Sequence, residues 1–160
     1  MKPIRENTHI VENVTTTLTD AITGATRSFT THNIPCNGQF SALAQWVSGL
    51  VANIGYNNVP PPSQIEYGSG TGTPQSSDTG PFTPISGSLT NLSYAQANTP
   101  QAGTTTLVFQ TAAGVVTTQI TEAFLRDSSG RAWGHLLYGA PFTPSSTETI
   151  TTQWELTYSA

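Results

Sequence analysis

The chain has 160 residues, a formal net charge of -4 and only 9% charged residues. That length fits one domain with a core of its own, and five scattered basic residues are too few for a nucleic-acid footprint. No apolar run is long enough to span a membrane, and residues 1–7 lack the apolar core of a signal peptide. We therefore expect no nucleic-acid or membrane partner, and synthesis in the cytoplasm of the cell that makes the protein.

Threonine is the most frequent residue of the chain. Because it is β-branched and carries a hydroxyl group, it suits the pleated, half-exposed surface of a sheet. The composition therefore predicts an all-β protein with a neutral, hydroxyl-rich exterior.

Residues 1–33 are expected to form an N-terminal arm that contains a hairpin. Residues 10–18 and 25–31 are two extended runs, and the segment DAITG between them supplies turn residues. Pro35 and the pair Asn37-Gly38 then interrupt the pattern. We place a second unit, a helix followed by a β-sandwich, at residues 34–160.

One helix is predicted, from Phe40 to Ile54. Apolar residues recur there at steps of three and four, and Gly55 is a natural stop. We interpret this apolar stripe as a core face rather than as a groove for a partner.

The rest of the chain is predicted to form short strands joined by turns. Strands are expected at residues 64–67, 89–97, 104–112, 118–126, 131–138 and 149–158. Asp127–Gly130 fits a four-residue hairpin loop. In the last strand, Ile150, Trp154 and Leu156 share one face and are expected to be core residues. This spacing of strands predicts an antiparallel β-sandwich with one helix in the N-terminal half.

The segment Ile65–Gln75, IEYGSGTGTPQ, permits two interpretations. Gly68, Gly70 and Gly72 could belong to a phosphate-cradling loop or to a turn that serves the fold. A phosphate loop needs a helix N-terminus behind it and usually a lysine, whereas the only lysine here is Lys2 and the following residues are rich in Pro and Ser. We favour the turn and expect no nucleotide cofactor.

The three histidines, His9, His32 and His135, lie far apart in the sequence, and none belongs to a close-spaced metal motif. Asp127 or Ser128 are the partners that a catalytic His135 would use. They fall in a hairpin loop, however, whereas His135 falls within a strand. We expect His135 to present a hydrogen bond at a surface or interface.

The carboxylates and the cysteine offer little chemistry either. Glu122 is expected to accept local backbone N–H bonds, and Glu148 and Glu155 face opposite sides of one strand. Asp78 lacks the companion oxygens of a calcium loop. Cys36 cannot form an internal disulfide and is expected to be a small buried residue. We therefore predict no catalytic, cofactor-binding or metal-binding residues, and no enzyme.

Several segments occur in a fixed order: FSALAQWVSGL, IEYGSGTGTP, TTTLVFQ, QITEAFLRDSSGRAWGHLLYGAPFTP and ETITTQWEL. From about Leu18 to Tyr158 the chain resembles a widespread group of small virion proteins of tailed bacteriophages. That group shows a helix, a strand of the type I-x-x-G-x-G-T and a closing Thr-rich strand that ends in x-W-x-L. The chain departs from the pattern at Phe124, where Gly is usual, and at His135, where an apolar residue is usual.

The resemblance implies that the glycine motif is a family turn and that the protein is a structural component of the virion. Three functions remain open: a tail or fibre-attachment assembly protein, which we favour, a capsid decoration protein that stabilises the head lattice, and a receptor- or glycan-binding module. Trp46 and Trp154 both fall on apolar faces, so exposed aromatics typical of glycan sites are not evident.

The expected partners are other virion proteins and further copies of the chain. A charge-poor surface lacks the usual devices that keep strand edges apart. We therefore expect a homo-oligomer or a lattice-bound subunit, in which the arm (residues 1–33) makes many of the contacts.

Overall fold

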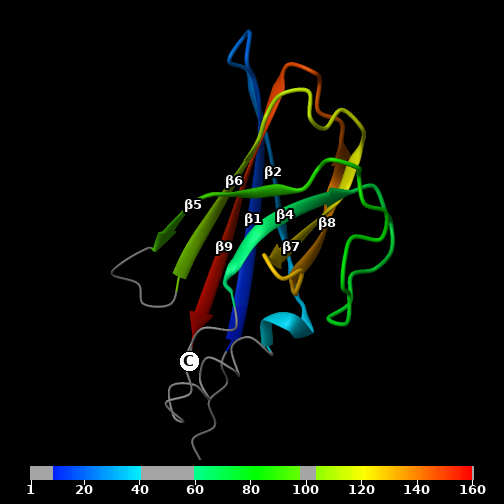
Figure 1. The fold of residues 1–160 in the computed structure, drawn as a ribbon. Coiled ribbons are helices and arrows are strands. Elements are labelled where there is room, and N and C mark those ends of the chain that lie inside the picture. The colour runs from blue at the N-terminus through cyan, green and yellow to red at the C-terminus, as the bar shows by residue number, and fades with distance from the viewer. Residues whose placement is uncertain (1–8, 41–59, 98–103, 160) are drawn as a thin grey trace, which may run out of the picture.

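The computed structural model describes residues 9–40, 60–97 and 104–159 (Figure 1). Within these ranges, nine strands form one antiparallel sheet in the order β2-β1-β9-β6-β5-β4-β7-β8-β3. The strands are β1 (His9–Asp20), β2 (Thr26–His32), β3 (Ile34–Pro35), β4 (Pro62–Gly68), β5 (Thr90–Ala97), β6 (Thr104–Thr111), β7 (Ile120–Asp127), β8 (Ala132–Phe142) and β9 (Glu148–Ser159). The predicted all-β, antiparallel class is confirmed for the described residues.

The sheet folds over on itself and nearly closes into a barrel (Figure 1). The fold-over lies at β5, which pairs with β6 from Leu92 to Ala97 but with β4 only at Thr90 and Asn91. At the other side β2 approaches β8, where the rings of Phe29 and Phe142 stack with centroids 4.2 Å apart. The strands β2-β1-β9-β6 therefore face β4-β7-β8 across a shared interior.

Strand β1 is an inner strand of this sheet. It pairs with β9 along its whole length, from His9–Ser159 to Asp20–Glu148, and with β2 on its other side. Its side chains Val14 and Leu18 are fully buried in the main core. Residues 9–32 thus share one sheet and one core with the rest of the described chain.

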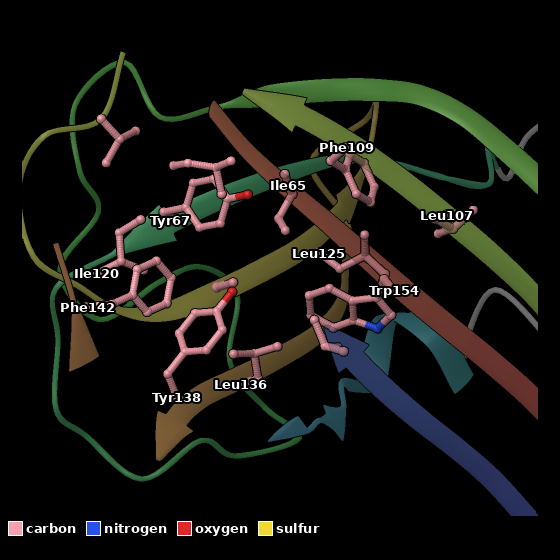
Figure 2. Close-up of a cluster of buried hydrophobic side chains, with 14 of the residues drawn as sticks. Ile65, Tyr67, Leu107, Phe109, Ile120, Leu125, Leu136, Tyr138, Phe142 and Trp154 are labelled. Atoms are coloured by element: carbon pink, nitrogen blue, oxygen red, sulfur yellow. The ribbon is translucent and has the colours of Figure 1, made fainter. Parts of the chain in front are cut away.

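The main core lies between the two facing halves of the sheet. Figure 2 shows Trp154 and Phe109, from β9 and β6, opposite Ile65, Leu125 and Leu136 from the other half. The expected core residues Ile150, Trp154 and Leu156 are all buried, as predicted. Their alternation with half-exposed Thr and Gln residues on β9 explains why the pattern was visible in the sequence.

A chain of hydroxyl groups lies inside this core. Thr152 Oγ1 is 2.8 Å from the hydroxyl of Tyr67 and 2.9 Å from Thr16 Oγ1, which is in turn 2.8 Å from the hydroxyl of Tyr138. Because a buried hydroxyl is costly unless it is hydrogen-bonded, this chain allows threonines to point inward. Burial raises the pKa of Tyr67 to about 12, so its phenol stays protonated.

The start of the predicted helix is described, and the rest is not. Residues 37–40 are helical, whereas residues 41–54 of the predicted helix, with Trp46, lie outside the described residues. The short strand β3 just before it was not predicted, because Pro35 is usually a strand breaker. It pairs with β8 at His135 and Gly134.

Candidate functional site

Loop 69–89, which joins β4 to β5, covers the outer face of β7 and β8. Ala123 and Leu125 of β7 face the main core, so the alternate side chains Glu122 and Phe124 point to the opposite face. His135 of β8 is the register partner of Phe124 and lies on that same outer face. The loop brings Asp78 against these residues. We call Asp78, Glu122 and His135 the His135 cluster.

The imidazole of His135 is held between two carboxylates. Its Nδ1 lies 2.6 Å from Asp78 Oδ2, and its Nε2 lies 2.8 Å from Glu122 Oε2. A neutral imidazole has only one N–H, so two hydrogen bonds to carboxyl groups require two protons among the three side chains. The three side chains therefore share two protons. A neutral imidazole between two ionised carboxylates would have only one.

Glu122 also accepts hydrogen bonds from the loop backbone. The N–H groups of Gly70 and Thr83 donate to Oε1 at 2.9 and 3.0 Å, and that of Phe82 donates to Oε2 at 3.0 Å. Burial raises the pKa of Glu122, but these three amides and His135 outweigh burial and hold the pKa below its ordinary value. An ionised carboxylate thus ties the start of the loop, at Gly70, to residues Phe82 and Thr83.

The glycines of the loop pack closely around this carboxylate. A Cβ atom at Gly68 or Gly70 would overlap Glu122 Oε1, and one at Gly72 would overlap the ring of Phe82. Glycine is therefore required for close approach rather than for a special backbone angle. The backbone amides do converge on an anion, as in a phosphate loop, but the anion is the protein's own Glu122. This geometry fits the turn interpretation of the motif.

Two expectations about this region were wrong. His135 does not lie at a surface: it is fully buried, with Phe82 and Phe124 beside its ring at centroid distances of 4.7 and 5.4 Å. Glu122 does accept backbone N–H bonds, but from residues 39 to 52 positions away rather than from local ones. In both cases the covering loop comes from a distant part of the sequence, which a local strand pattern does not show.

Asp127 and Ser128, the residues considered as partners of a catalytic His135, do not contact it and belong to the β7–β8 hairpin loop. Asp127 Oδ1 accepts the N–H groups of Ser129 and Arg131, both within the β7–β8 hairpin, at 2.9 and 3.0 Å. Asp127 thereby closes the predicted hairpin loop, in which Gly130 has a φ of 84°. Ser128 is exposed at the tip of this loop.

A second buried carboxylate, Glu12, was missed by the sequence analysis. It lies on the inner face of β1 and is only 3% exposed. Its Oε2 accepts a hydrogen bond of 2.8 Å from Trp154 Nε1 and another from Asn33 Nδ2. We call Glu12, Asn33, Gln39 and Trp154 the Glu12 cluster. The missed signal was parity, since Glu12 has the same strand parity as the buried Val14.

The Glu12 cluster leaves its carboxyl group much more basic than Glu122. Burial raises the pKa of Glu12 to about 7, and the hydrogen bonds from Trp154, Asn33 and Gln39 offset this only in part. No backbone amide contributes to the shift, in contrast to the three that reach Glu122.

The other residues considered in the sequence are not assembled into a reactive site. Cys36 is buried, as predicted, and burial raises the pKa of its thiol to about 12, with Asp78 and Glu12 adding to the effect. His32 is exposed on β2, and the side chain of His9 lies outside the described part of the chain. Among the described residues, no group of three or more His, Cys, Asp or Glu side chains is placed to hold a metal ion.

The geometry of the His135 cluster suits it to hold the loop. Both ring nitrogens of His135 are engaged with carboxylates, so neither is left for a substrate. A surface hollow of about 360 Å³ lies elsewhere, beside β6 and β9, and is lined by Gln110, Thr111, Ala112, Thr149 and Thr151. In the described ranges, no helix has the length and hydropathy needed to cross a membrane.

Comparisons of the chain with family models, with curated proteins and with solved structures find no match. The resemblance to tailed-phage virion proteins therefore rests on the sequence motifs alone.

Proposed function

We propose that the protein is a non-enzymatic structural subunit of a tailed-phage virion, placed in the tail or the fibre-attachment region. Its partners are other virion proteins and further copies of itself. The order of sequence motifs supports this proposal. One structural observation supports it further: the middle of the outer face of β2, β1 and β9 carries hydroxyl and amide side chains, with His32 and Glu155 in the neighbouring row.

The register of the strands places hydroxyl and amide side chains in rows across that face. Thr15 Oγ1 lies 3.3 Å from Thr30 Oγ1, and Thr17 Oγ1 lies 2.9 Å from Ser28 Oγ. On the other side of β1, Thr15 and Thr17 are the register partners of residues on β9. The first row is Thr30, Thr15 and Gln153, and it ends on β6 at the buried Val108; the second row is Ser28, Thr17, Thr151 and Gln110.

Such a face is suited to a permanent contact with another protein. Hydroxyl and amide groups form hydrogen bonds that depend little on salt, because few charges are available to be screened. Lysine and glutamate, the residues that usually keep sheet surfaces apart in solution, are nearly absent from these rows. A neighbouring subunit would cover the rows without having to bury an unpaired charge.

We also propose that the fold is best described as a β-sandwich. The two facing halves are joined through β5, whose pairing with β4 is limited to Gln64–Asn91 and Ile65–Thr90. In a fully closed barrel this ladder would continue along β5. Interstrand nuclear Overhauser effects between β4 and β5 should therefore be confined to these pairs, and contacts beyond Leu92 would contradict the sandwich.

The assembly proposal is tested by placing charge on the polar face. Thr15→Lys combined with Gln153→Lys puts two cations on register partners whose side chains point away from the core. We expect a folded protein that no longer joins virions. Ser128→Lys, at an exposed hairpin tip, is the matched control and should be incorporated normally. Normal incorporation of the double variant would show that this face is not the contact surface.

Copy number distinguishes the two virion locations. Densitometry of purified particles should give few copies for a tail or fibre-attachment protein, whereas hundreds of copies would favour the alternative of a capsid decoration protein.

The hollow beside β6 and β9 favours a third candidate function, a receptor- or glycan-binding module, because hydroxyl and amide groups line it. Glycan binding that Gln110→Ala abolishes would support that receptor-binding function.

A further inference from the structure

Glu12 and Asn33 each have a buried oxygen atom without a hydrogen-bond partner. These atoms are Glu12 Oε1 and Asn33 Oδ1. The same two side chains are already joined, because Asn33 Nδ2 donates to the other carboxyl oxygen, Glu12 Oε2. Glu12 and Asn33 are therefore in direct contact, and each carries one unpaired acceptor.

Two acceptors cannot satisfy each other, and each one left unpaired in the interior is costly. A single proton on Glu12 Oε1 would remove both deficits, because the resulting O–H can donate to Asn33 Oδ1. The acid and the amide would then form a ring with two hydrogen bonds, O–H to the amide oxygen and N–H to the carbonyl oxygen of the acid. Glu12 Oε2 would keep its bond from Trp154.

We propose that Glu12 is a proton-operated clasp: its neutral carboxyl group forms a two-bond ring with Asn33 that ties β1 to the segment before β3, and ionisation opens this ring. The clasp joins distant parts of the chain. Trp154 brings in β9, and Gly134 of β8 lies so close that a Cβ there would overlap Asn33 Nδ2. Opening the ring therefore loosens contacts among β1, β8 and β9.

The charged groups near the clasp do not replace the proton. Cys36 and Asp78 are the acidic groups on the neighbouring segment and loop, and neither supplies a cation. His135 of β8 points to the opposite face of its strand, toward Asp78 and Glu122. On the outer face of the sheet, His32 of β2 and Glu155 of β9 are the register partners of Asn13, next to Glu12.

Among the described residues, Arg131 is a further charged group near the clasp, beside Gly38. Its Nε lies 3.9 Å from Asp127 Oδ2 of the hairpin, and its buried Nη1 has no hydrogen-bond partner. The pKa of Glu12 agrees with the proposal, since burial raises it to about 7. That value corresponds to a proton affinity about 300-fold above that of an ordinary glutamate.

The first test follows the proton in the unmodified protein. The ¹³C resonance of the Glu12 side-chain carboxyl should titrate with a midpoint near 7. The indole N–H of Trp154 and the side-chain amide of Asn33 should shift with the same midpoint, whereas the indole of Trp133 should not. A midpoint near 4.5, the ordinary value, would overturn the proposal. A midpoint that falls when Ca²⁺ or Mg²⁺ is added would also overturn it, because a cation would then be what pairs the two oxygens.

The second test uses Glu12→Gln, which supplies a permanent N–H donor where the proposal places the proton. The denaturant midpoint of the unmodified protein should fall as pH rises through about 7, and that fall should be lost in Glu12→Gln. Glu155→Gln, on the outer face of β9, is the control and should keep the fall. Equal pH dependence in Glu12→Gln and the unmodified protein would show that Glu12 is not the clasp.

Discussion

Glu122 and Glu12 are both buried, yet the structure gives them opposite acidities. Glu122 receives three backbone N–H groups and an imidazole, and its pKa lies below the ordinary value. Glu12 receives an indole and side-chain amides, and its pKa rises to about 7. The comparison shows that burial alone does not decide the charge of a carboxyl group. Burial is the largest single contribution to the pKa of both groups, and only at Glu122 do the hydrogen-bond donors together outweigh it.

The two carboxyl groups also stabilise different kinds of structure. Glu122 holds a loop, because its donors Gly70, Phe82 and Thr83 come from two separate parts of that loop. Glu12 joins strands, because Trp154 comes from β9 and Asn33 follows β2. An irregular loop has free backbone amides to offer, whereas the amides of a strand are used by the sheet.

The largest loss of stability is expected when the Glu122 side chain is removed. Glu122→Ala leaves His135 and three backbone N–H groups without their shared acceptor, so we expect a destabilisation of about 3–5 kcal/mol in urea unfolding. Glu66→Ala on neighbouring β4 is the control, since it breaks only a partly exposed ion pair with Arg126 and should cost less than about 1 kcal/mol. Similar losses in the two variants would contradict the role given to Glu122.

The free energy of unfolding should depend on pH through both Glu122 and Glu12. The lowered pKa of Glu122 contributes stability above pH 4.5 that is lost as pH falls through its folded-state pKa. The raised pKa of Glu12 acts in the opposite direction: its contribution is full below pH 4.5 and is lost as pH rises through about 7. From 4.5 to 7, the second loss amounts to about 3 kcal/mol.

Urea unfolding over a pH series should therefore give a maximum on the acidic side of neutrality, with a decline on either side. Stability that rises steadily from mildly acidic to alkaline pH would show that Glu12 is ionised throughout.

A smaller effect is expected from Gly70→Ala. The added Cβ would lie 2.5 Å from Phe82 Cβ and 2.7 Å from Glu122 Oε1, so the loop must shift and weaken its bonds to the carboxylate. We expect a loss of about 1–3 kcal/mol, measured by thermal unfolding. Gly139→Ala is the control, because a Cβ at Gly139 meets nothing within 4 Å. If the Gly70→Ala and Gly139→Ala variants unfold at the same temperature, the loop is not packed as closely as described.

The smallest effect concerns one hydrogen bond to Glu12. Trp154→Phe removes the indole N–H but keeps an aromatic ring, and we expect a loss of about 1–2 kcal/mol. Because that hydrogen bond lowers the pKa of Glu12, the titration midpoint should move upward. The control is Trp133→Phe, whose indole reaches Asp127 instead. An unchanged titration midpoint of Glu12 in Trp154→Phe would show that Trp154 does not affect the pKa of Glu12.

Local patterns predicted the strands well and the polar clusters poorly. The alternation in β9 and the turn residues Asp127 and Gly130 are local signals, and the structure has the corresponding elements. By contrast, the donors to Glu122 come from a loop that crosses the outer face of β7. Nothing near Glu122 in the sequence indicates which segment covers it.

The Glu12 cluster illustrates a different limit. Inward-facing Glu12 breaks the rule that strand interiors are apolar, and only its partners explain why the fold tolerates it. Asn33 is nearby in sequence, but Trp154 is 142 positions away. In the same way, Thr16 and Thr152 point inward because Tyr67 and Tyr138 are there to bond them.

The pairing of β1 with β9 has a consequence for how the chain folds during synthesis. β1 is made first among the described strands and β9 last, yet they are neighbours along their full length. Until β9 leaves the ribosome, β1 has only β2 as a partner, and a two-stranded hairpin is marginally stable in water. This long-range pairing must therefore wait until β9 has been synthesised, which favours slow folding. During that interval the edge of β1 is open to pairing with other nascent chains.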